Sequence, residues 1–95
     1  MDERGMIERK CASEMWKIQE WREDEDGLCA VVGRAEVLED DEEAGLYSGD
    51  AGELTVSVVG AEEYGNQRAH VGFTPDEYDG DGAVEVRDLG TIELL

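Results

Sequence analysis

The sequence predicts an α+β fold in which one N-terminal helix packs on a four- or five-stranded antiparallel sheet. Apolar residues recur every three to four positions before Gly27, which is typical of one face of a helix. After Gly27 they alternate with polar residues, which is typical of half-buried strands. The connections between the alternating segments are mostly of hairpin size, so we expect neighbouring strands to be antiparallel.

The first element is expected to be a helix over residues 2–22, because its apolar side chains fall on one face: Ile7, Cys11, Met15 and Ile18. The acidic residues 23–26 would oppose the negative end of the helix dipole, and Gly27 offers a left-handed stop. Trp16 and Trp21 lie off this face, and we expect them at the edge of the core.

The remaining elements are expected to be strands. In the first, Cys29, Val31, Ala35 and Val37 would share a face, with a bulge or a close backbone approach at Gly33. The next strands are expected at residues 54–58 and 69–73, followed by one or two strands at 84–86 and 92–94. Thr74 and Pro75 have the features of a helix start, which predicts a short helical turn there.

The length of 95 residues indicates a single domain over residues 1–95, divided into a neutral amphipathic helix (1–22) and an acidic β-rich part (28–95). The formal net charge is -18, so nucleic acids and anionic membranes are repelled, and we expect no direct binding to either. No segment has the features of a signal peptide or a membrane span, which favours a cytoplasmic protein, or the host cytoplasm if it is viral.

No motif indicates catalysis, and we expect neither an enzyme nor a cofactor. Cys11, Cys29 and His70 are the only soft metal ligands and show no zinc-site spacing, so the cysteines are interpreted as small buried hydrophobic residues rather than a disulfide. The segment 77–82 has oxygen ligands at alternate positions before a glycine, but it lacks the final glutamate of a calcium loop. We therefore interpret it as an acidic hairpin turn and expect no specific calcium site there.

The negative charge is concentrated in blocks outside the first helix. Within residues 1–19 four acids balance four bases, whereas residues 36–50 carry seven acids and no base. Such blocks usually form solvated loops and turn tips. If they serve a partner, the binding residues are expected to be Glu36, Glu39, Asp40, Asp41, Glu42, Glu43, Asp50, Asp76, Glu77, Asp79 and Asp81.

Two functional hypotheses remain open. The first is an inhibitor or decoy whose carboxylates replace phosphates in the nucleic-acid groove of a basic partner. Strand residues two apart are roughly 6.6 Å apart on one face, so their acidic side chains can follow the spacing of a phosphate backbone. Small phage proteins that block restriction or CRISPR effectors share this size and acidity. This is an analogy between types of protein and not a sequence match. The alternative is a housekeeping or regulatory domain of a halophilic organism, whose acidity is salt adaptation. A homodimer through the helix is compatible with both.

Overall fold

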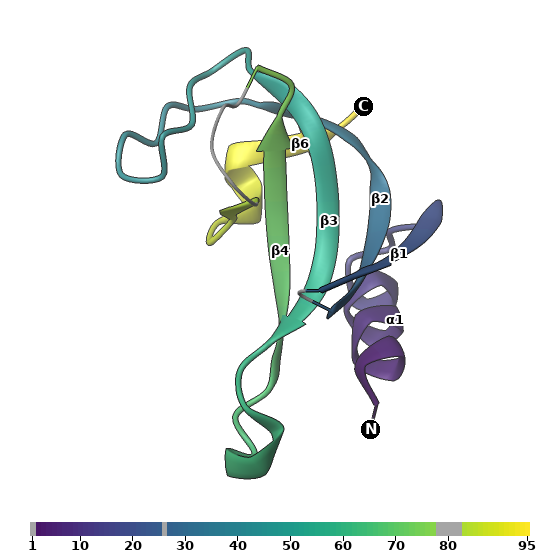
Figure 1. Cartoon of the computed structure of the whole chain (residues 1–95). Helices are drawn as coiled ribbons and strands as arrows, with labels where there is room; N and C mark the ends of the chain where they lie inside the picture. The colour runs from purple at the N-terminus through teal and green to yellow at the C-terminus, as the bar shows by residue number, and fades with distance from the viewer. Residues whose placement is uncertain (1, 26, 78–82) are drawn as a thin grey trace.

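The α+β fold is confirmed by the computed structural model, which describes residues 2–25, 27–77 and 83–95 (Figure 1). Among these residues, one α-helix, α1 (Glu3–Ser13), packs on a six-stranded sheet. The strands are β1 (Glu20–Asp24), β2 (Gly27–Val37), β3 (Ala51–Val59), β4 (Arg68–Pro75), β5 (Val84–Glu85) and β6 (Ile92–Leu94). Short 3-10 turns, η1 (Glu62–Tyr64) and η2 (Leu89–Thr91), lie between them.

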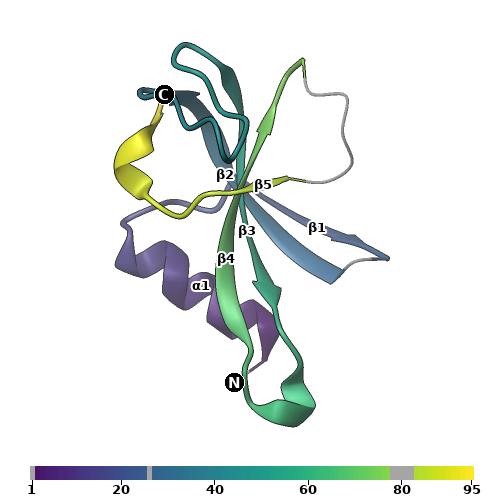
Figure 2. The ribbon, with the colours of Figure 1, turned by 90° about the vertical axis from the view of Figure 1, so that its left-hand side faces the viewer.

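The sheet is antiparallel, and its last strand is added to the edge of an earlier one. Its strands follow the order β1-β2-β3-β4-β5, and every pairing is antiparallel. β6 pairs with the second half of β2, on the edge that β1 occupies along the first half. The chain from β5 to β6 therefore crosses from β4 to β2 over one face of the sheet, the same face that α1 covers (Figure 2).

A bulge in β2 changes which side chains face the core. The register with β3 shifts between Val31 and Gly33, and Gly33 has a φ of 145°, a conformation that favours glycine. The prediction that Cys29 and Val31 share the core face is therefore wrong, because the extra residue inverts the alternation of side chains. The β2 side chains in the core are Ala30, Val32, Ala35 and Val37.

The helix is shorter than the predicted segment 2–22. It ends at Ser13, two residues before Met15, whose φ of 62° lies in the left-handed region and breaks the helical path. The Trp16 N–H then donates to the carbonyl of Cys11 at 2.8 Å, which closes the turn. The chain becomes extended and enters the sheet as β1, a strand that the sequence did not predict.

Both tryptophans pack against the edge of the core, as expected. Trp21 lies on β1 opposite Ala30, and the guanidinium of Arg4 sits 4.6 Å from the centre of its ring. This contact holds the N-terminal turn of α1 against β1, the outermost strand of the sheet.

The core lies between the sheet and the two segments that cover one of its faces, α1 and the chain from β5 to β6. Ile7 and Cys11 of α1 and Phe73 of β4 are almost completely buried, and burial raises the pKa of the Cys11 thiol despite the opposing charge of Lys10. Cys29 is half-buried on the other face, and the two cysteines are not joined by a disulfide.

The predicted helical turn at Thr74 and Pro75 is wrong. Both residues belong to β4, where Thr74 lies opposite Glu53 and Pro75 opposite Gly52. A Cβ on Gly52 would collide with the backbone of Thr74, so the two strands approach too closely here for any other residue. This tight pairing extends β4 to the end of the sheet where the acidic segments begin.

Candidate protein-binding site

The acidic connection between β2 and β3, residues 38–50, is built around one buried side chain. Leu46 is 2% exposed and belongs to the core. Asp41 and Leu46 form a two-residue bridge in which each N–H donates to the other's carbonyl, at 2.7 and 3.0 Å. We call residues 38–50 the acidic loop. Its shape is set by hydrophobic anchoring and backbone pairing, although the sequence suggested only an exposed connection.

Three of its aspartates stabilise this loop through hydrogen bonds to backbone N–H groups. Asp40 accepts from Ser48 at 2.8 Å, Asp41 from Ala44 at 3.2 Å, and Asp50 from Tyr47 at 3.3 Å. Aspartate is well suited to this role because its short side chain can reach the backbone of neighbouring residues. These carboxylates hold the loop in shape.

The glutamates of the acidic loop are differently placed. Glu39, Glu42 and Glu43 are exposed, and within the described part of the chain no side chain forms an ion pair or hydrogen bond with them. Two large apolar side chains of the same loop are also exposed, Leu38 at 45% and Tyr47 at 53%. The surface of the loop thus combines uncompensated negative charge with an aromatic ring, a residue type enriched at protein interfaces.

The second acidic segment lies at the same end of the sheet. The N–H of Asp76 donates to the carbonyl of Ala51 at 3.0 Å, so the end of β4 is fixed beside the end of the acidic loop. Asp50, Asp76 and Glu77 all line one open groove of about 510 Å³. The structure therefore brings Asp76 and Glu77, the described part of the second block, beside the acidic loop, and we call residues 38–50 with 76 and 77 the acidic end.

The carboxylates of the acidic end are not equivalent. Asp76 forms a two-pronged ion pair with Arg34, and the hydrogen bond from this guanidinium, assisted by its charge, keeps the pKa of Asp76 below its usual value. Glu77 is exposed, and no described side chain pairs with it. Glu36 is half-buried on β2, opposite Ala51. Asp79 and Asp81 lie outside the described residues.

Elsewhere on the sheet some carboxylates are compensated by arginines. Arg22 binds Glu53 with nitrogen–oxygen distances of 2.6 and 3.1 Å and also contacts Glu20 at 3.0 Å. The hydrogen bond with Glu53 is the main reason that the pKa of Arg22 is raised. At the tip of the acidic loop, by contrast, no described ion pair compensates Glu42 or Glu43, although Arg87 lines the same hollow as Glu43.

The sequence did not identify Leu38 and Tyr47 as site residues, since their exposure depends on how Leu46 anchors the loop. No three described His, Cys, Asp or Glu side chains are grouped as metal ligands, and the calcium-loop segment lies largely outside the described residues. Within the described chain, no helix has the length and apolar character needed to cross a bilayer. No protein-family model, curated protein or solved structure matches this chain.

Proposed function

We propose that the acidic end binds a basic, nucleic-acid-handling protein and excludes nucleic acid from its groove, a role of the kind that phage-type anti-restriction or anti-CRISPR inhibitors have. The observation that carries this proposal is the trio Glu39, Glu42 and Glu43. These carboxylates are exposed and have no partner in the described chain, on a loop whose backbone is held by Leu46 and three aspartates. A loop that is already shaped loses less conformational entropy when it binds.

The chemistry of such an interface follows from its charges. Carboxylates that face lysines and arginines of a groove accept the same charge-assisted hydrogen bonds as phosphates do. Long-range attraction between a strongly acidic and a basic protein also accelerates association, and salt weakens this effect. Tyr47 and Leu38 would add apolar contact area that phosphates cannot supply.

The test uses the triple variant Glu39→Gln, Glu42→Gln and Glu43→Gln. Its matched control, Glu23→Gln, Glu25→Gln and Glu63→Gln, removes the same charge from exposed positions outside the acidic end. The immobilised parent is expected to capture a basic protein from a lysate of the source cells or their host, and added duplex DNA or RNA should release it.

The triple variant should capture much less of that protein, while the control should behave as the parent does. If the protein is only adapted to high salt, the triple variant and its control will behave alike. That result, or a captured protein that nucleic acid does not release, would contradict the proposed function.

A further inference from the structure

The part of β4 that precedes Gly72 forms a sheet edge. β5 pairs with β4 only at Gly72 and Phe73, after which the Val86 N–H donates to the Val71 carbonyl at 2.8 Å. Backbone groups of alternate residues point the same way in an antiparallel ladder, so the N–H and carbonyl of Ala69 face this edge as well. No described strand covers β4 at Ala69 on this side.

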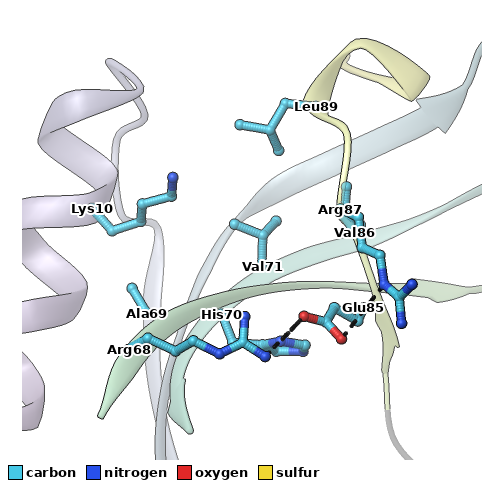
Figure 3. Close-up of a pocket in the computed structure, with 9 residues that line it drawn as sticks. All are labelled: Lys10, Arg68, Ala69, His70, Val71, Glu85, Val86, Arg87 and Leu89. Atoms are coloured by element: carbon cyan, nitrogen blue, oxygen red, sulfur yellow. Dashed lines mark hydrogen bonds and ion pairs between the residues drawn. The ribbon is translucent and has the colours of Figure 1, made fainter. Parts of the chain in front are cut away.

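A groove runs along this edge between α1 and the C-terminal segment (Figure 3). Lys10 of α1 stands on one side and Leu89 on the other, with Val71 between them. This hollow measures about 490 Å³ and adjoins a second hollow of about 610 Å³ that α1 also lines, with Lys10 and Ala69 lining both. We call the two together the β4 groove.

The β4 groove gathers bases in a chain that has few of them. Four of the eight lysines and arginines line it: Arg9, Lys10, Arg68 and Arg87. Among its described lining residues, Glu85 is the single acid. Lys10 also contacts Glu14 at 3.3 Å, whereas no described side chain pairs with Arg9. The local excess of charge is positive, opposite in sign to the whole molecule.

Glu85 holds the basic side chains at the edge of β4. It contacts Arg68 at 3.2 Å, His70 at 3.7 Å and Arg87 at 4.0 Å. Partial burial acts to raise the pKa of Glu85, but the hydrogen bond from Arg68 and the charges of the three bases together outweigh it and keep the pKa below its usual value. The carboxylate therefore stays ionised near neutral pH and keeps the guanidinium groups beside the free edge.

We infer that the β4 groove binds an extended, acidic segment of a partner protein as an additional strand along β4. Backbone hydrogen bonds to Ala69 would fix its direction, alternate carboxylates would meet Arg68 and Arg87 or Arg9, and an apolar side chain would cover Val71. A long nucleic acid fits poorly because the net charge of -18 repels a polyanion. A short peptide with a few carboxylates experiences mainly the local positive charge. Glu85 and Arg87 also line a hollow of about 420 Å³ together with Glu43 of the acidic loop, so this site adjoins the acidic end, but it prefers the opposite kind of ligand.

The test uses a fluorescent peptide of alternating Glu and Val, with blocked termini, titrated with the whole protein. Arg9→Gln should weaken binding about threefold, and Arg9→Gln with Arg87→Gln about tenfold. Lys17→Gln is the matched control, since Lys17 is exposed and, like Arg9, pairs with no described side chain, but it does not line the groove. It should change the affinity less than about twofold.

A second measurement examines the strand pairing itself. Bound peptide should slow hydrogen exchange at the Ala69 amide and leave the amides of β1, at the opposite edge of the sheet, unchanged. The inference is overturned if the arginine variants bind as tightly as the Lys17 control, or if the Ala69 amide is unaffected. Equal binding of a Lys and Val peptide, or a second copy of the chain occupying the groove at the concentrations used, would also overturn it.

Discussion

At the acidic end, exposed glutamates project from the loop without partners in the described chain, whereas the β4 groove is lined by four bases and one glutamate. Both regions are built on one small sheet. They contain the same types of charged side chain, and they differ in how far the negative charges are paired with bases. Where an arginine lies near an acid, as Arg22 does near Glu53, part of the negative charge is compensated. The net charge of -18 is thus unevenly distributed over the surface, and the local arrangement of charged side chains decides which ligands each region attracts.

The largest expected effect comes from removing the anchor of the acidic end. Leu46→Ala deletes a side chain that is 2% exposed and should lower the free energy of unfolding by about 2–5 kcal/mol, because burial is lost and a cavity remains. Urea denaturation measures this. Leu38→Ala, in the same loop but exposed, should cost less than about 0.5 kcal/mol. Equal losses would show that the loop is not anchored as described.

The bulge in β2 lies between the half of the strand that pairs with β1 and the half that pairs with β6 and precedes the acidic loop. Gly33→Ala places a Cβ at a φ of 145° and should destabilise the fold by about 1–3 kcal/mol. The measurement is the free energy of unfolding. A neutral effect would show that this backbone conformation is not needed.

Substitutions in the acidic loop should change the free energy of unfolding less, and those of its aspartates should cost more than those of its glutamates. Asp41→Ala removes the acceptor of the Ala44 N–H and should cost about 0.5–1.5 kcal/mol, whereas Asp41→Asn keeps an oxygen there and should cost less. Glu42→Gln should be neutral or slightly stabilising, because it relieves repulsion. Chemical denaturation of the three variants checks this order, and an Asn variant as unstable as the Ala variant would refute it.

The ion pair that borders the acidic end should be visible in the pH dependence. Because the pKa of Asp76 is lower in the folded state, its stabilisation is present above the unfolded-state pKa and is lost as the pH falls through the folded-state value. Asp76→Asn should be less stable than the parent at pH 7, and the difference should shrink toward about pH 3. Glu77→Gln is the control at neutral pH. A difference that grows on acidification would contradict the ion-pair assignment.

Salt should act on the molecule as a whole. Like charges repel in the compact state, and screening shortens their reach from about 10 Å at 0.1 M to about 3 Å at 1 M salt. The melting temperature should therefore rise with KCl, and it should rise less steeply in the variant Glu39→Gln, Glu42→Gln and Glu43→Gln. A flat curve for the parent would mean that the acids are locally compensated.

The strands that alternate clearly were predictable, because each buries one face within its own hydrophobic pattern. Leu54 and Val56 of β3 and Val71 and Phe73 of β4 face the core as expected. The end of α1 was not predictable, because the apolar spacing continues past Met15 to Ile18. Residues 20–24 enter the sheet by pairing with the next strand, β2, from Glu20 opposite Val31 to Asp24 opposite Gly27, and the helical apolar spacing gives no sign of this pairing.

The candidate site was predictable in part. The acid blocks follow directly from the sequence, and their meeting at one end follows from strand pairing, which the hairpin pattern suggested. The structural role of Asp40 and Asp41 could have been predicted from their place near turn residues. The β4 groove could not, because Lys10, Arg68 and Arg87 are far apart in the chain and meet only through the packing of α1 and the path of the C-terminal segment.

The most direct test of the central claim is a competition experiment on the captured basic protein. Labelled duplex DNA or RNA bound to that protein is titrated with the parent chain, and fluorescence anisotropy reports displacement. The parent should displace the nucleic acid, and the variant Glu39→Gln, Glu42→Gln and Glu43→Gln should displace it more weakly and with less dependence on salt. Equal displacement by parent and variant would contradict the account.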